Sequence, residues 1–136
     1  MSKNSCVTYR TFKNVFTLEK YLLLKDSVDR INISKFRCGN SRIPTVILRD
    51  RHLNIPYENR ICQLCNMRLI GDENHYVLIC PVYQLQRQKY LENYYIIEPD
   101  MEKFSELFQS INFNILRKLA KYISEINTRL REDHRI

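Results

Sequence analysis

At 136 residues the chain has the length of one domain, and its composition is globular, with 44% hydrophobic and 27% charged residues. Its longest apolar stretch, near residues 21–24, is too short to span a bilayer, and polar residues follow Met1 where a signal peptide would be apolar. We therefore expect a single domain (residues 1–136) that is intracellular, nuclear or cytoplasmic, and has no membrane contact. In a reducing compartment, clustered cysteines are more often metal ligands than disulfides.

The net charge of +7 is placed unevenly along the chain. Residues 1–56 carry 11 Lys and Arg against 4 Asp and Glu, whereas residues 57–97 and 98–136 are each balanced. A basic segment of this kind is typical of a nucleic-acid contact, and equally of a solvated face that only keeps a protein soluble. If the segment binds RNA or DNA, the expected phosphate-binding residues are Lys35, Arg37, Arg42, Arg49, Arg51 and Arg60.

The basic segment 1–56 is expected to be largely helical. Apolar residues recur at helical spacing over residues 17–30, with Thr17 as the N-cap. Asn32 is expected to cap a short second helix that ends at Gly39. Two prolines and alternating apolar residues then predict an extended chain or a short strand over residues 40–57.

The most specific pattern in the chain is C-x2-C-x9-H-x4-C, within residues 57–95. Three thiols and one imidazole make the S₃N tetrahedral shell that Zn²⁺ favours, and four protein ligands leave no open position for a reacting water. The pattern therefore predicts a structural zinc site. The alternative is a set of buried apolar cysteines with a core histidine. The predicted ligands are Cys62, Cys65, His75 and Cys80.

The geometry of the second half of this motif depends on Pro81. Asp72 is expected to cap a short helix in which His75 and Cys80 lie about 140° apart around an ideal α-helix, so they do not share a face. Pro81 removes the difficulty, because it pushes Cys80 out of the α region and ends the helix there. Pro81 also suits the start of a following helix that runs to about Tyr95 and holds further apolar residues, Val82, Leu85, Tyr90 and Leu91.

Two more helices are predicted, over residues 101–109 and 113–131, after Asp100 recaps the chain. The second has a single apolar stripe that favours a core face or a partner face over a cofactor site. The expected fold is therefore mainly α, with the zinc loop between a basic helical half and a C-terminal helical hairpin (98–136). The stripe comprises Leu116, Leu119, Ala120, Ile123, Ile126 and Leu130.

Other residues give weaker signals. Cys6 and Cys38 lie outside the motif and are expected to be small buried apolar residues. Cys38, which precedes Gly39, is an alternative ligand, but no spacing to a partner favours it. His52, in a basic loop, would be the base of a metal-dependent nuclease, but a lone histidine there is far more often exposed to solvent. Three aromatic residues flank the zinc motif and would either stack on bases or pack around the metal: Tyr57, Tyr76 and Tyr83.

The motif and its flanking residues resemble the zinc-binding region found downstream of the polymerase in non-LTR retrotransposon reverse transcriptases. The similarity rests on Arg60-x-Cys62-x2-Cys65 followed by Asp72-Glu73-x-His75-x4-Cys80-Pro81-x-Tyr83, and is good over residues 30–95 and looser to 130. The resemblance implies zinc held by the four predicted ligands, and a supporting role in nucleic-acid engagement by a retroelement protein.

The sequence thus predicts a non-enzymatic, zinc-stabilised module, derived from a retroelement, that binds nucleic acid through its basic half. A second hypothesis is a protein-interaction module in which the stripe over residues 113–131 docks a partner helix or pairs with itself. A nuclease that uses His52 is the third.

Overall fold

The computed structural model describes residues 20–37 and 55–133, and within them the chain is mostly helical, with one isolated antiparallel bridge between Ile61 and Ile70. The predicted mainly α class is confirmed for these residues. No described helix is both long and apolar enough to cross a membrane. The elements are η1 (Lys20–Leu23), α2 (Ser27–Arg37), η2 (Tyr57–Asn59), η3 (His75–Ile79), η4 (Pro81–Tyr83), α4 (Gln84–Tyr90), α5 (Asn93–Ile96), α6 (Met101–Phe108) and α7 (Phe113–Asp133). Of these, η1, η2 and η4 are 3₁₀ turns and η3 is a π-helical turn.

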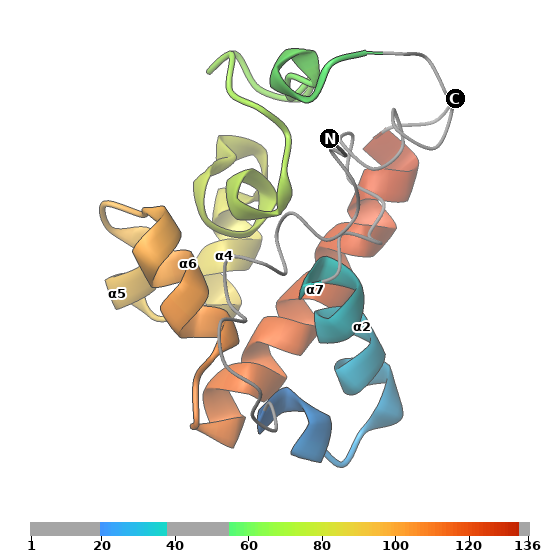
Figure 1. Cartoon of the computed structure of the whole chain (residues 1–136), viewed down its shortest axis with the longest axis vertical. Coiled ribbons are helices and arrows are strands. Elements are labelled where there is room, and N and C mark those ends of the chain that lie inside the picture. Colours follow the sequence, from blue (N-terminus) through green and yellow to red (C-terminus); the bar gives the residue numbers. More distant parts are fainter. Residues whose placement is uncertain (1–19, 38–54, 134–136) are drawn as a thin grey trace.

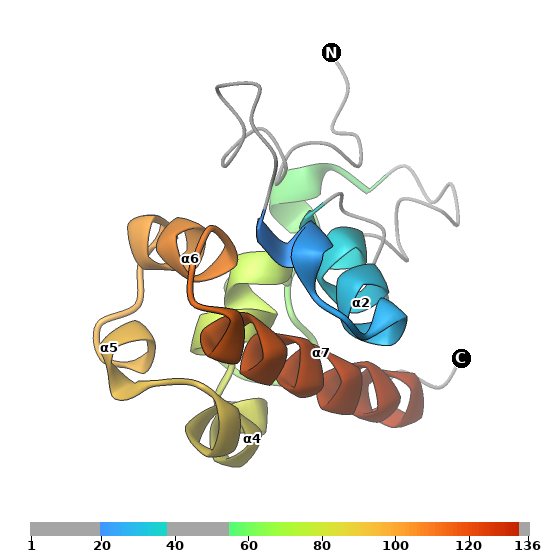
Figure 2. The ribbon, with the colours of Figure 1, turned by 90° about the horizontal axis from the view of Figure 1, so that it is seen from below.

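The long helix α7 is the central element, against which α2, α4 and α6 pack. It packs against α2 on one side and α4 on the other, as Figures 1 and 2 show from two directions. The predicted apolar stripe is the face that α7 buries, and all six of its residues are buried. The stripe therefore belongs to the core of this chain, and a partner helix could use it only by displacing α2 and α4.

The N-terminal helix boundaries were predicted wrongly. In place of a continuous helix to residue 30, η1 ends at Leu23 and α2 starts at Ser27. The cause is Asp26, whose carboxylate accepts a hydrogen bond from the Val28 N–H at 2.9 Å and so caps the new helix. Asn32 lies inside α2 and caps nothing. The predicted cap Thr17 and stop Gly39 lie outside the described residues.

The helix expected to run from Pro81 to about Tyr95 is two helices. Leu91 takes an extended backbone (ψ 147°), which ends α4, and Glu92 does the same before α5. The next predicted start is confirmed, because the Asp100 carboxylate accepts a hydrogen bond from the Lys103 N–H at 2.8 Å and caps α6.

The buried face of the η4–α4 segment also differs from the expected one. Val82 and Leu85 are exposed to solvent, whereas Tyr83 and Arg87 are buried. Leu91 is buried and Tyr90 packs against the core, as expected, but apolar periodicity failed for Val82 and Leu85 because part of the inner side of α4 is polar. It presents the Arg87 guanidinium to backbone carbonyls of the preceding turn.

Candidate metal centre

The first two cysteines lie on a short loop closed by backbone hydrogen bonds. The Cys62 N–H donates to the Leu69 carbonyl at 2.9 Å, and the Gly71 N–H donates to the Arg60 carbonyl at 2.9 Å. These bonds flank the Ile61–Ile70 bridge, so the chain turns back on itself at residues 69–71. Arg68 turns the loop with a positive φ of 58°.

Gly71 lets this loop approach the helical turn closely. A Cβ atom at position 71 would lie 3.2 Å from the Tyr76 ring and 3.3 Å from the Cys62 Cα, which is tighter than ordinary contact. The Tyr76 hydroxyl in turn donates a hydrogen bond to the Cys62 Sγ at 3.0 Å. The absence of a side chain at Gly71 therefore lets Tyr76 reach the Cys62 sulfur.

Asp72 caps the turn that carries His75, as predicted. One of its carboxylate oxygens accepts from the His75 N–H at 2.9 Å, and the other accepts from the Tyr57 hydroxyl at 3.3 Å. Burial raises the pKa of the Asp72 carboxyl above its usual value, and the bond from the His75 N–H opposes that shift. Asp72 thereby ties the segment before the loop to the start of the turn.

The turn between His75 and Cys80 is π-helical, which the sequence analysis did not anticipate. The Cys80 N–H donates to the His75 carbonyl at 2.7 Å, an i→i+5 bond that widens the turn. Residues five apart can then lie on one side of the helix, which an α-helical turn does not allow. The predicted effect of Pro81 is also confirmed, since Cys80 leaves the α region with ψ 120°.

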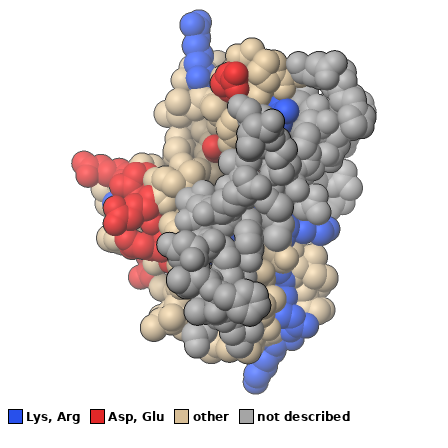
Figure 3. Space-filling model, viewed as in Figure 1, with Lys and Arg blue, Asp and Glu red and all other residues tan. Residues whose placement is uncertain are grey.

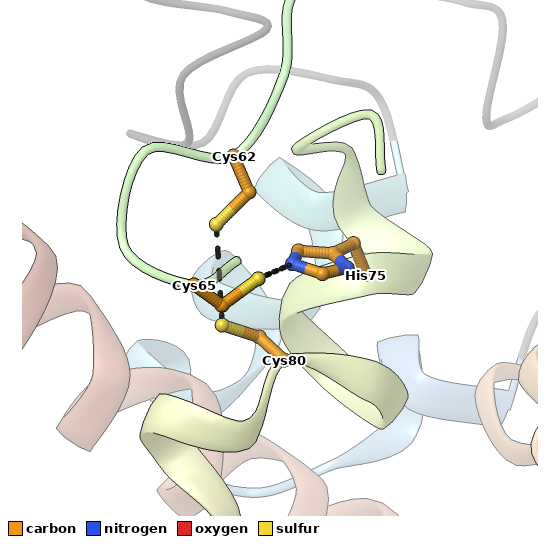
Figure 4. A group of neighbouring side chains, drawn as sticks. All are labelled: Cys62, Cys65, His75 and Cys80. Atoms are coloured by element: carbon orange, nitrogen blue, oxygen red, sulfur yellow. Dashed lines mark hydrogen bonds between the residues drawn. The ribbon is translucent and has the colours of Figure 1, made fainter. Parts of the chain in front are cut away.

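These two segments bring the four predicted ligands together in one cluster, the Cys₃His cluster (Figure 4). Their ligand atoms all lie within 4.8 Å of one another. The sequence prediction of which residues gather here matches this arrangement. The cluster lies on the inner side of the turn, and all of its residues are buried except Cys65, which is half-buried. Its residues are Cys62, Cys65, His75 and Cys80.

Two of the spacings within the cluster are close to those of a tetrahedral metal shell. The Cys62 and Cys80 Sγ atoms are 4.0 Å apart, and the Cys65 Sγ is 3.5 Å from the His75 Nε2. Around a tetrahedral Zn²⁺, bond lengths of about 2.3 Å to sulfur and 2.0 Å to nitrogen place two sulfurs about 3.8 Å apart and a sulfur about 3.5 Å from the nitrogen. The donor set and its dimensions therefore suit one ion.

The environment of the Cys62 sulfur favours its thiolate form. The hydrogen bond between Cys80 and Cys62 lowers the pKa of the Cys62 thiol and raises that of the Cys80 thiol. The Tyr76 hydroxyl bond also lowers the pKa of Cys62. The bonds to the Cys62 sulfur therefore favour the thiolate, which is the form of cysteine that binds metals.

Among the predicted phosphate-binding residues, the structure places Lys35 on the surface of α2 but buries Arg37 and Arg60. Arg37 donates to the Phe108 carbonyl at 3.3 Å, and Arg60 donates to the Ile55 carbonyl at 3.1 Å. Both therefore support the fold, and their assignment to phosphate contacts is corrected. Several other predicted residues lie outside the described part of the chain: Cys6, Cys38, Arg42, Arg49, Arg51 and His52.

The aromatic residues around the cluster pack against it. Tyr76 and Tyr83 are buried, with ring centroids 6.2 Å apart, and Tyr57 is half-buried. Burial raises the pKa of the Tyr76 hydroxyl, which keeps it a donor to the Cys62 sulfur. Of the two uses expected for these rings, the structure shows packing for Tyr76 and Tyr83.

Sequence reasoning missed Arg87 and Tyr122, which join the turn to the helices. Arg87 donates to the Val77 carbonyl at 2.8 Å and to the Cys80 carbonyl at 2.9 Å, and the Tyr122 hydroxyl donates to the Tyr76 carbonyl at 2.6 Å. The available signal was Pro81, which has no N–H and so leaves carbonyls of the preceding turn in need of other donors.

Comparisons of this chain with protein-family models, with curated proteins and with solved structures gave no match. Its description therefore rests on its own residues. They define a mainly helical protein with a Cys₃His cluster, between helices, that is suited to hold a metal ion.

Proposed function

We propose that the Cys₃His cluster binds one Zn²⁺ and that this ion is structural. The observation that carries the proposal is the set of four ligand atoms within 4.8 Å of one another, with two of the pairs close to the spacings of a tetrahedral zinc shell. Three thiolates and an imidazole are soft and borderline ligands, which select zinc over calcium or magnesium. Four protein ligands fill a tetrahedral shell, so the site supports a non-enzymatic role.

The expected contribution of the ion to stability follows from the segments that the cluster joins. It joins the loop at residues 60–71 to the turn at 72–80, and the described backbone of the loop has no regular helix or strand pairing beyond one bridge. Binding of structural zinc is worth on the order of 10 kcal/mol in small domains, comparable with the whole stability of a domain of this size. Loss of the ion is therefore expected to unfold at least residues 57–95.

Elemental analysis of the purified protein tests the proposal directly. We expect one zinc per chain, with loss of helical circular dichroism when a chelator removes it. Cys80→Ser should abolish stoichiometric zinc binding, whereas Cys38→Ser, a thiol outside the cluster, should retain it. Protein that contains no zinc, takes up none and is unaffected by the chelator would refute the proposal.

A second proposed function is nucleic-acid binding through the basic N-terminal half. In the view of Figure 3, Asp and Glu gather over α5 and α6, whereas Lys and Arg lie apart from them, over the α2 side and at the upper end. This separation of charge supports a surface that attracts phosphate away from α5 and α6. Lys35 is exposed on α2 and, of the three predicted contacts within the described residues, is the accessible one. The retroelement origin, which rests on the motif resemblance, stays a prediction.

Fluorescence anisotropy with single- and double-stranded DNA and RNA tests this second function. We expect affinity to fall linearly with salt on logarithmic axes, because phosphate contacts release counterions. Lys35→Ala should weaken binding and reduce that slope, whereas Lys89→Ala, on α4 at the other side of α7, should not. Absent binding, or binding insensitive to salt, would contradict the function.

A further inference from the structure

The side chain of Arg87 is fully buried, with 0% of its surface exposed. Its hydrogen-bond partners are neutral: the Gln84 amide oxygen at 2.9 Å, the Tyr122 hydroxyl at 3.5 Å and three backbone carbonyls. Within the described residues its guanidinium contacts no carboxylate. The carbonyls belong to Tyr76, Val77 and Cys80.

A buried positive charge with only neutral partners requires compensation. A guanidinium stays charged throughout the physiological pH range, and an unpaired buried charge is strongly unfavourable even when its N–H groups are hydrogen-bonded. The carbonyl dipoles at the end of the turn supply part of the compensation. A full negative charge nearby would supply the rest.

The proposed metal shell has that charge. Zn²⁺ with three thiolates and one neutral imidazole carries a net charge of −1, and three of its four ligand residues are buried. Arg87 bonds to the carbonyl of the ligand Cys80 itself, at 2.9 Å. The two buried charges are thus opposite in sign and equal in size, and one residue belongs to both networks.

We propose that Arg87 is the counter-charge of the zinc–thiolate centre and a positioning residue for it, so that the site is built for a shell of net charge −1. The inference rests on the proposed zinc function. Arg87 holds the carbonyls of the turn that joins the ligands His75 and Cys80, which fixes the turn in its wide form. Its charge then stabilises the three thiolates that the metal requires.

Two substitutions separate the charge of Arg87 from its hydrogen bonds. Arg87→Gln keeps donors and removes the charge, and Arg87→Lys keeps the charge while losing the planar fork. The measurement is the zinc dissociation constant, by competition with a chromophoric chelator. We expect Arg87→Gln to weaken zinc binding by about 10- to 100-fold, as for other residues that orient metal ligands, and Arg87→Lys to weaken it less.

Arg37 provides the matched control. It is also buried (1% exposed) and lies on α2. Its guanidinium donates a hydrogen bond to the backbone carbonyl of Phe108, which is not a residue of the cluster. Arg37→Gln and Arg37→Lys are expected to have the same zinc dissociation constant as each other. A difference between Lys and Gln that is confined to position 87 therefore isolates the charge effect.

A double-mutant cycle adds a second, independent measurement. Cys65→His replaces the half-buried ligand and makes a neutral S₂N₂ shell. If Arg87 balances charge, Arg87→Gln should weaken zinc binding less in the Cys65→His background than in the native one. If Arg87 acts only through its hydrogen bonds, the loss should be equal in both backgrounds. Should Arg87→Gln alone fail to fold with excess zinc, the same comparison is made on folding, which Cys65→His should then restore.

The outcomes distinguish the proposed role of Arg87 from the proposed zinc binding on which it rests. Native protein that binds no zinc refutes the proposed function, and the counter-charge with it. The counter-charge alone is refuted if the native protein binds zinc but Arg87→Lys and Arg87→Gln weaken zinc binding equally. It is also refuted if Cys65→His does not reduce the loss of zinc affinity that Arg87→Gln causes. Co²⁺ spectra provide a further readout, because Arg87→Gln is expected to shift the thiolate-to-metal absorption bands, which Arg37→Gln should leave in place.

Discussion

The metal-binding segment (residues 60–83) and the α2–α7 pair bury side chains equally well but by different means. Along α7, six apolar residues at helical spacing make one continuous core face. The metal-binding segment instead buries thiols, an imidazole and the Arg87 guanidinium behind a loop and a π-helical turn. Apolar burial is favourable by itself, whereas buried polar groups need partners. We therefore expect the helix pair to fold from its sequence pattern alone, and the segment to require the proposed ion.

Removal of the proposed metal is expected to produce the largest difference between the metal-binding segment and the α2–α7 pair. On chelation, amide hydrogen exchange at Cys62, Gly71 and Cys80 is expected to accelerate by several orders of magnitude, because structural zinc contributes on the order of 10 kcal/mol. Amides along the buried face of α7 should lose much less protection. Mass spectrometry of proteolytic fragments measures both regions at once. An equal loss in both would show one cooperative unit and end the distinction.

A core substitution in α7 tests the other region. Leu119→Ala is expected to lower the free energy of unfolding by about 2–5 kcal/mol, because it leaves a cavity in the stripe. Urea denaturation of the zinc-loaded protein gives the value, and the zinc content should stay at one per chain. Leu85→Ala, at an exposed position of α4, is the matched control and should change stability by less than about 0.5 kcal/mol.

Gly71→Ala examines the close approach inside the metal-binding segment. The added methyl would press on the Tyr76 ring and the Cys62 backbone, so we expect a loss of about 1–3 kcal/mol in the zinc-loaded protein. Gln63→Ala, exposed on the same loop, should have little effect. If Gly71→Ala is as stable as the native protein, the loop adjusts freely, and its packing on Tyr76 does not position Cys62.

The smallest expected effect concerns the bond that links the two regions. Tyr122→Phe removes the donor to the Tyr76 carbonyl while keeping the ring, and should lower the free energy of unfolding by about 1 kcal/mol. In the exchange experiment, the variant should also make protection of α7 less dependent on zinc. If chelation changes the exchange protection of α7 equally in the variant and the native protein, other contacts couple α7 to the metal-binding segment.

Much of the architecture could be predicted because its residues follow regular periods. The stripe of α7, the caps Asp72 and Asp100 and the four ligands each have a local signature, and the structure places all of them as expected. The break before α2 was missed because Asp26 competes with a continuous apolar pattern. Its carboxylate satisfies the Val28 N–H, which is enough to start a new helix.

Arg37, Arg60 and Arg87 show where composition misleads. Charge counting treats each arginine as a surface charge, but all three lie buried among backbone carbonyls. A long side chain with five donors can form hydrogen bonds with carbonyls that irregular turns leave unpaired. The sequence does not indicate which turns these are. The π-helical turn was missed because it depends on a main-chain hydrogen bond between Cys80 and His75, which their side chains do not signal.

The wide turn between His75 and Cys80 also limits how this chain can vary in length. In an α-helix, ligands four residues apart stack on adjacent turns, so His-x3-Cys suits an α-helical turn, whereas His-x4-Cys needs the i→i+5 form seen here. One residue added or removed between the two ligands would therefore change the type of helix as well as its length. Insertions and deletions are expected to be tolerated on the loop near Arg68 and excluded between His75 and Cys80.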